Sequence, residues 1–577
     1  MMSMKLTIHK IVVSCAGLLL VLGCVATGKP PGERSPASTS QSSWERFIGD
    51  FTEEFFRINP DRASQAGRHE FDGRLPDWSQ DGMAKSIAGI RELQSRVAAV
   101  SEIELTEEQR FQRQYLLAAL RAELFWREGS ESPFESIDSY RHSFEIFHLV
   151  YGGHAPPEQR REGVIKFSRS LVRACAQIRE NIRLPMAEEL RAHSEQVVRG
   201  LADFFNKDVK MVFSEAQDAE FAEANAQAIA ALGELAVFFN SQKGKGSKSF
   251  ALGEEKFRRM LAEVEGVTVP LAEIKRAGFA DLRRNQRSLR KWCDKFAPGK
   301  PVSDCVEQAT SEKPDDILAT AQGQLVELKT FVKAHDVVAI PSDDEVIVRE
   351  TPSYLRWNTA SLRSPGVYDQ GLPAAYFIAP PDPSWPRDVQ RKYLKSKWEL
   401  LITSVHEVWP GHFLHTLHDN LRPPILGRIF RAYSTVEGWA HYTEEMMVDI
   451  GLGDDDPRIH IAQIKWALLR DARMLSALGL HTENWSREKS EEFFRNEAFA
   501  SPGLAKQQSM RGVFDPDYLG YSLGKLMVLK LREDWTKTRG GRKAWREFHD
   551  KFVSYGNAPV PLIRAFMLGA SDNGKLL

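Results

Sequence analysis

The stretch 393–415, YLKSKWELLITSVHEVWPGHFLH, combines a helical pattern with three closely spaced histidines. Its apolar residues recur at helical spacing, which predicts a helix that begins after Pro386 and extends to the first histidine. There, His406 and Glu407 form the first half of a helical zinc motif, whose second histidine stands four residues after the first. The next histidine in this chain is instead His412, so chelation requires a departure from regular helix.

A proline and a glycine separate the two histidines. Residues six apart on a straight helix project about 120° from each other, too far for one ion. Pro410 has no N–H to donate to the carbonyl of His406, and its ring crowds the preceding turn. Gly411 tolerates backbone angles that other residues avoid. We therefore expect the helix to break at this pair and His412 to return toward His406.

A third ligand is predicted in EGWAHYTEE (437–445), which begins with Glu437. Two imidazoles and one carboxylate leave a zinc ion one position for water. Zinc lowers the pKa of that water and polarises a substrate carbonyl, while Glu407 is placed to take the proton as general base. These residue types together predict hydrolysis of an amide bond.

Other residues near the motif leave alternatives open. Glu444 or Glu445 could replace Glu437 as a ligand, because positions 437, 441 and 444 share one helical face. His415 and His418 could offer a further nitrogen or act as supporting residues. His69 is also followed by glutamate, but no second histidine follows at motif spacing, and we interpret it as structural.

Three motifs, HEVWPGH (406–412), EGWAHYTEE (437–445) and YSLGKLMVLKLR (521–532), resemble the bacterial DUF885 family (domain of unknown function 885). DRASQAGRHEFDGRLPDWS (61–79) and LGEEKFRRMLAEVEG (252–266) extend the resemblance over most of the chain. The family is assigned to zincin-like metallopeptidases. The resemblance therefore implies a mainly α fold with a small antiparallel sheet beside the active-site helix, and zinc-dependent hydrolysis of peptide bonds.

The family motifs imply His406, His412 and Glu437 as ligands of Zn2+ and Glu407 as the catalytic base. The chain departs from the family pattern at His415, where members commonly carry glutamine. It also matches the family loosely over 352–380, and it lacks an aspartate near 477–478. These departures concern substrate preference more than metal binding.

Further candidates follow from side-chain chemistry. Tyr521 is a candidate donor to the oxyanion, since a phenol stays protonated at neutral pH; the alternative is a half-buried helix tyrosine. Arg473 and His481 are candidates for binding a substrate carbonyl or C-terminal carboxylate, or else for helix packing. AAYFIA (374–379) is either an edge strand that pairs with an extended peptide or a core strand.

The first residues resemble a bacterial lipoprotein signal. Two lysines precede an apolar run too short for a comfortable membrane span, and the run ends in VLGC (21–24). This predicts a signal peptide over 1–23, diacylglycerol on Cys24 and a flexible tether over 24–43. Val25 favours the outer membrane, with the protein facing the periplasm.

The remaining chain divides into a predicted helical part, 44–335, and a zinc-binding catalytic part, 336–577. Short β-branched or aromatic runs, 344–352 and 374–380, predict strands in the second part. Cys293 and Cys305 flank a Pro/Gly loop and are candidates for a disulfide in an oxidising compartment.

The formal net charge of −1 gives no support to nucleic-acid binding, and the expected partners are a peptide and the membrane. Two rival functions remain: a metal-binding lipoprotein without activity, and a hydrolase of another bond, such as a glycosidase.

Overall fold

The computed structural model describes residues 36–577, apart from 214–217, 247, 352–358, 370, 382–385, 422–425, 570–571 and 573. The predicted signal peptide and Cys24 lie outside the described residues. Within the described part, no helix is both long and apolar enough to cross a membrane.

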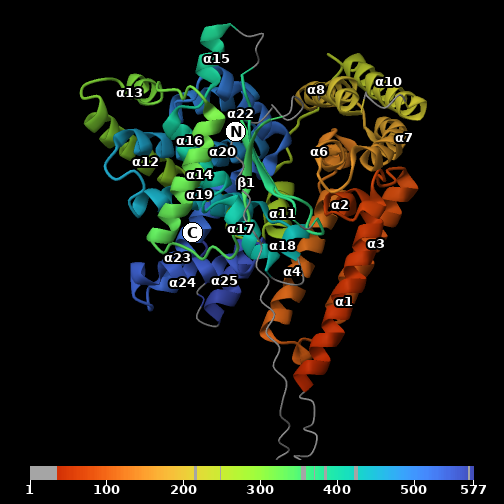
Figure 1. The fold of residues 1–577 in the computed structure, drawn as a ribbon, viewed down its shortest axis with the longest axis horizontal. Helices are drawn as coiled ribbons and strands as arrows, with labels where there is room; N and C mark the ends of the chain where they lie inside the picture. Colours follow the sequence, from red (N-terminus) through yellow and green to blue (C-terminus); the bar gives the residue numbers. More distant parts are fainter. Residues whose placement is uncertain are drawn as a thin grey trace, which may run out of the picture.

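The chain is mainly helical, as predicted (Figure 1). Before the sheet the helices are α1 (Pro36–Ile58), α2 (Pro60–Gln65), α3 (Gln80–Ala99), α4 (Glu107–Leu124), α5 (Asp138–Arg141), α6 (Phe147–Tyr151), α7 (Pro157–Asn181), α8 (Glu188–Phe204), α9 (Lys210–Phe213), α10 (Ala219–Ser241), α11 (Glu254–Val264), α12 (Leu271–Phe296), α13 (Val302–Ala309) and α14 (Ile317–Ala334).

After the sheet the helices are α15 (Arg387–Tyr393), α16 (Lys397–Glu407), α17 (His412–Asn420), α18 (Leu426–Ile429), α19 (Tyr433–Asp449), α20 (Pro457–Thr482), α21 (Arg487–Glu497), α22 (Pro502–Phe514), α23 (Gly520–Thr536), α24 (Trp545–Val553) and α25 (Val560–Leu568). The pairs α19–α23 and α12–α20 pack closely along their lengths and form the frame of the carboxy-terminal part.

The helix α1 begins at Pro36, inside the segment 24–43 that we predicted as a flexible tether. Trp44, Ile48 and Phe51 bury one face of the helix, and this packing anchors it. The Ala, Ser, Thr and Gln residues before Trp44 contain no further helix breaker, so the helix continues toward the amino terminus.

Three short strands form one mixed sheet, β1 (Val346–Glu350), β2 (Ala360–Arg363) and β3 (Ala374–Ile378), in the order β1-β3-β2. β1 is parallel to β3 and β2 is antiparallel to it, so the expected all-antiparallel sheet is corrected to a mixed one. β3 is the central strand, and the edge-strand interpretation of 374–379 is therefore wrong. Tyr376, Phe377 and Ile378 are all buried, as in a core strand.

Two large hydrophobic clusters and a third of only three buried residues lie in the described part of the chain. The larger cluster joins α1, α3, α4 and α11–α14 to the sheet and the carboxy-terminal helices. The second large cluster lies mainly among α5–α10, and its helices α7, α8 and α10 occupy one corner of the molecule in Figure 1. The larger cluster thus contains residues from both sides of the predicted boundary near residue 335.

Cys293 and Cys305 form a disulfide between α12 and α13, with their Cα atoms 5.7 Å apart. This agrees with the pairing that we considered from the sequence. The bridge covalently links the two helices across the short loop between them. Cys175 is a free, buried thiol in α7.

Candidate metal centre and cavity

The single helix predicted to begin after Pro386 is two helices, α15 and α16, and the second ends just after the first histidine, as predicted. Ser396 and Glu399 form a capping box at the start of α16, and the helix ends at Glu407. The next helix, α17, begins at His412. In the connection, the Gly411 N–H donates to the carbonyl of Val405 (3.0 Å), and Trp439 donates from Nε1 to the carbonyl of Pro410 (3.0 Å).

Gly411 is required by a close approach rather than by an unusual φ. A Cβ at this position would lie 1.8 Å from the carbonyl oxygen of His406. The chain therefore folds back tightly on the end of α16. As a result the rings of His406 and His412 lie 4.7 Å apart at 83°, as the break was expected to allow.

Glu437, from the second turn of α19, completes a three-residue group. Its Oε2 lies 3.3 Å from Nε2 of His406 and 3.4 Å from Nε2 of His412. This carboxylate oxygen is buried and has no hydrogen-bond partner among the described residues. A buried, charged oxygen without a donor is costly unless something else satisfies it.

The donor set fits a zinc ion. Ligand atoms at about 2.0–2.1 Å from a tetrahedral ion lie roughly 3.3 Å from each other. The two distances from the Glu437 oxygen match that spacing. An ion held by His406, His412 and Glu437 would satisfy the orphaned oxygen and both imidazole nitrogens.

Glu444 supports His406 from behind. The Nδ1–H of His406 donates to Glu444 (2.7 Å), which leaves Nε2 directed at the group. Glu444 is fully buried and forms two contacts with Arg470, at 2.8 and 2.9 Å. Burial alone would raise the pKa of Glu444, but Arg470 and the hydrogen bond from His406 lower it well below its usual range. The sequence suggested Glu444 only as an alternative ligand.

The other alternative ligands point elsewhere. Glu445 pairs with Arg284 and Lys525. His415 donates from Nε2 to the carbonyl of Gly556 (3.1 Å), and His418 contacts the carbonyl of Ala339 through Nε2 (2.9 Å). Within the residues that the structure describes, Glu437 is therefore the carboxylate grouped with the two motif histidines.

Glu407 is 9% exposed and is held by the sheet. Its Oε2 accepts a hydrogen bond from the backbone N–H of Leu362 in β2 (2.8 Å). This contact fixes the carboxylate between α16 and the edge strand of the sheet. This bond was not predictable, because ASLR (360–363) has no strand-like pattern of its own.

Tyr521 lies beside the histidines on the first turn of α23. Its ring is 6.2 Å from that of His406 and 5.6 Å from that of Tyr433. His481, in contrast, is occupied by the backbone: Nδ1 accepts from the N–H of Leu252 (3.3 Å) and Nε2 donates to the carbonyl of Gly512 (2.7 Å). This favours the packing interpretation of His481 over substrate binding.

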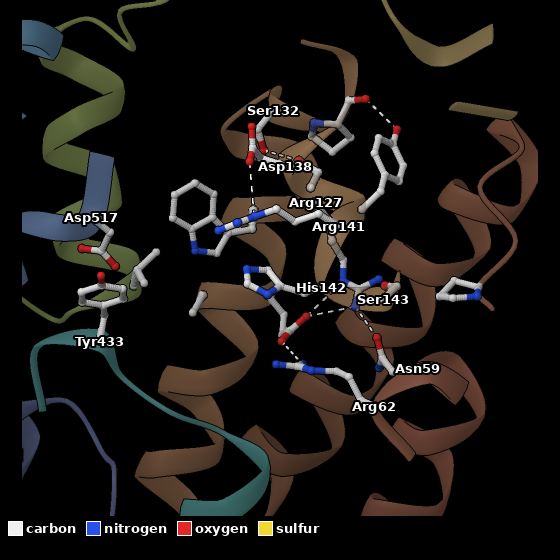
Figure 2. Close-up of a pocket in the computed structure, with 18 of the residues that line it drawn as sticks. Asn59, Arg62, Arg127, Ser132, Asp138, Arg141, His142, Ser143, Tyr433 and Asp517 are labelled. Carbon is white, nitrogen blue, oxygen red and sulfur yellow. Dashed lines mark hydrogen bonds and ion pairs between the residues drawn. The ribbon is translucent and has the colours of Figure 1, made fainter. Parts of the chain in front are cut away.

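A cavity of about 1080 Å³ reaches this group from the amino-terminal helices. Glu437, Tyr433 and Tyr521 line one end. The opposite wall comes from α1–α5 and carries Arg62 and Arg127, both ion-paired with Glu123 (Figure 2). This wall was not predictable from the motifs, because the residues that form it lie far from the motifs in the chain.

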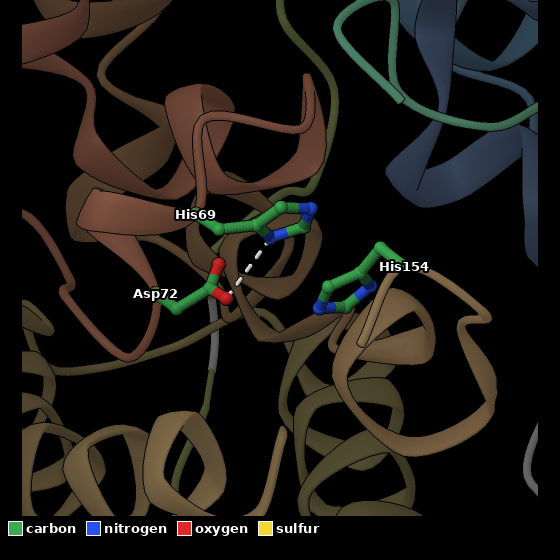
Figure 3. Close-up of side chains that lie close together, drawn as sticks. All are labelled: His69, Asp72 and His154. Atoms are coloured by element: carbon green, nitrogen blue, oxygen red, sulfur yellow. Dashed lines mark hydrogen bonds and ion pairs between the residues drawn. The ribbon is translucent and has the colours of Figure 1, made fainter. Parts of the chain in front are cut away.

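His69 belongs to a separate cluster, shown in Figure 3. It contacts Asp72 through Nδ1 (3.0 Å) and Asp369 through Nε2 (2.8 Å), and its ring stacks on His154. The hydrogen bonds that His69 donates to Asp369 and Asp72 raise its pKa to about 9. His69, Asp72 and His154 also lie close enough together to hold a metal ion, but both ring nitrogens of His69 already contact carboxylates. The contacts of His69 link the segment after α2 to the β2–β3 loop, which supports its structural interpretation.

A family model described as a bacterial protein of unknown function, DUF885, matches residues 60–567. The chain belongs to the DUF885 family. Two solved structures share its fold. One, a "putative lipoprotein of unknown function" from Shewanella oneidensis, is 24% identical with a TM-score of 0.77, covering 91% of this chain and 99% of that one. The other, described as a "putative lipoprotein", is from Colwellia psychrerythraea and is 16% identical with a TM-score of 0.77. The match covers 92% of this chain and 100% of that one. No curated protein matches the chain.

Proposed function

We propose that this DUF885 protein is a zinc-dependent peptidase of the cell envelope, anchored by lipid on Cys24. The observation that carries the proposal is the buried Glu437 oxygen, which lies close to two imidazole nitrogens and has no hydrogen-bond donor in the described part of the chain. The same residue lines the large cavity. A zincin-like active site is the arrangement that best accounts for both facts.

A zinc ion bound there would acidify a water molecule and polarise a substrate carbonyl. Glu407 takes the proton of the attacking water through the carboxylate oxygen that is free of Leu362. The hydroxyl of Tyr521 donates to the carbonyl oxygen as charge develops on it. Glu444 keeps Nε2 of His406 directed at the metal by holding the proton on Nδ1.

Peptides are the proposed substrates because the cavity is large and lined by both parts of the chain. Its volume of about 1080 Å³ admits several extended residues but no folded domain. The envelope location rests on the sequence VLGC (21–24), and the two structural neighbours are themselves described as lipoproteins. Changing Cys24→Ser should abolish labelling with a fatty acid, and a wild type without label would refute the anchor.

The test is digestion of a peptide mixture by the purified mature protein, with and without a chelator. We expect cleavage that stops on chelation and returns with zinc. A non-catalytic metal protein would cleave nothing under any condition. A glycosidase would also leave peptides intact, and its activity on glycosides would survive the chelator.

The variant His412→Ala identifies the metal site. It should lose most of the bound zinc, because only one imidazole and one carboxylate remain. His418→Ala is the matched control, since His418 lies on the same helix and contacts Ala339 instead. If His412→Ala kept one zinc per chain, the ligand assignment would be wrong.

A further inference from the structure

Three arginines converge on the ring of Tyr521. The guanidinium carbon of Arg473 lies 4.6 Å from the ring centroid, that of Arg470 lies 5.5 Å away and that of Arg511 lies 5.6 Å away. Arg470 and Arg473 come from consecutive turns of α20, and Arg511 comes from α22. Three positive charges therefore surround one aromatic ring beside the candidate metal centre.

Only two of these charges have a carboxylate partner among the described residues. Arg470 pairs with Glu444 (2.8 Å), and Arg511 pairs with Asp515 (3.0 Å). Arg473 donates from Nε to the neutral side chain of Gln508 (2.7 Å) and forms no ion pair within the described part of the chain. It is nevertheless only 8% exposed.

A buried guanidinium without a counter-ion is costly, and a ring face or an amide replaces a carboxylate only in part. Burial and the neighbouring Arg511 and Arg470 lower the pKa of Arg473, in keeping with a crowded positive site. A metal ion next to Tyr521 would add further positive charge. Arg473 remains the guanidinium of this group that lacks a carboxylate partner among the described residues.

A negative charge for Arg473 can be supplied from the cavity. Arg511, Tyr433 and Tyr521 line it, and the Arg511 guanidinium donates to the Tyr433 hydroxyl (2.6 Å). Arg473 lies directly behind this wall, against Tyr521. An anion that enters the cavity would contact Arg511 at the cavity wall, and the positive charge of Arg473 would balance its negative charge.

We propose that this arginine site binds the C-terminal carboxylate of a peptide, so that the protein removes short fragments from the carboxyl end. The inference rests on the proposed peptidase function and adds its end specificity. The path from the His406 ring past Tyr521 to the arginines is at most about 12 Å, a span of roughly three extended residues. The released fragment is therefore one to three residues long.

The experiment measures binding rather than cleavage. The zinc-loaded Glu407→Gln variant is titrated by calorimetry with trialanine and with trialanine amide. We expect the free acid to bind roughly tenfold or more tightly, because the amide lacks the charge that the site requires. In Glu407→Gln combined with Arg473→Met, the two ligands should bind equally weakly.

Arg473→Met should fold, because it removes a buried charge without breaking an ion pair. Arg290→Met, on the exposed face of α12, is the matched control and should keep the preference for the free acid. Equal binding of acid and amide to the parent variant would overturn the proposal. Loss of the preference in Arg290→Met would do the same, since the effect would then not belong to this site.

Two further arms separate the alternatives. If chloride, compared with gluconate, strengthened binding of acid and amide alike, the bound anion would be inorganic and the carboxylate assignment would be wrong. Hydrolysis by the wild type separates the two proposals. A preference for the free acid without any hydrolysis would support the carboxylate site and refute the peptidase function. Equal hydrolysis of acid and amide would support the peptidase function and refute the carboxylate site.

Discussion

Replacing Glu444 with glutamine should weaken zinc binding although Glu444 is not a ligand. In the structure its carboxylate accepts the Nδ1–H of His406 at 2.7 Å and contacts Arg470 at 2.8 and 2.9 Å. Glutamine keeps the shape and one acceptor oxygen but loses the charge. The Nδ1–H of His406 then has a weaker acceptor, and Nε2 becomes a poorer ligand.

Supporting residues of this kind contribute about 10–100-fold to metal affinity, or roughly 1.4–2.8 kcal/mol. Glu444→Gln also removes one partner of a fully buried ion pair, which should cost about 3–5 kcal/mol in the free energy of unfolding. Zinc affinity is measured by competition with a chromophoric chelator, and stability by urea unfolding of the metal-free protein. The two readouts separate the loss of metal from the loss of fold.

The neighbouring residue provides the control. Glu445→Gln also breaks ion pairs, one with the exposed Arg284 and one with the buried Lys525, and neither partner is among the contacts of His406 within the described residues. It should lower stability and leave zinc affinity unchanged. The reasoning fails if Glu444→Gln binds zinc as tightly as the wild type, or if both variants lose affinity to the same extent.

Three further outcomes are expected. Gly411→Ala places a Cβ 1.8 Å from the carbonyl oxygen of His406, so the purified variant should lose zinc and unfold at lower urea than the wild type. Replacing Cys293 and Cys305 together by serine should lower the free energy of unfolding by about 3 kcal/mol, because the bridge closes a loop with a sequence separation of 12. An unchanged urea midpoint would exclude a stabilising bridge. The pKa of His69 is raised from 6.5 to about 9, so protonated His69 stabilises the folded state fully below pH 6.5, and this contribution is lost as the pH rises through 9. His69→Gln should therefore flatten the pH dependence of the free energy of unfolding between these values. A profile identical to that of the wild type would contradict the assignment.

The sequence predicted the elements that local patterns determine. The helical run 271–292 lies within α12, and the β-branched run 344–352 contains β1. Strand β2 was missed because ASLR (360–363) becomes a strand only by pairing with β3 and by donating to Glu407. The mixed order of the sheet was also missed, because strand order depends on tertiary contacts and not on composition.

The candidate site was predictable where its chemistry is close in sequence. The Pro-Gly pair and the spacing of His406 and His412 indicated the break in the helix, and the family motif indicated Glu437. The role of Glu444 was not predictable, since three glutamates on one helix satisfy the pattern equally well. The unpaired charge of Arg473 depends on α20, α22 and α23 packing together, which no short motif records.

The central claim, zinc-dependent peptide hydrolysis with Glu407 as base, is tested most directly by the rate of peptide cleavage in purified Glu407→Gln that carries one zinc per chain. Glutamine cannot accept the proton of the attacking water, while the ligands His406, His412 and Glu437 are untouched. The account predicts full metal content and a rate at least about 100-fold below that of the wild type. Wild-type cleavage by the zinc-loaded variant would contradict it.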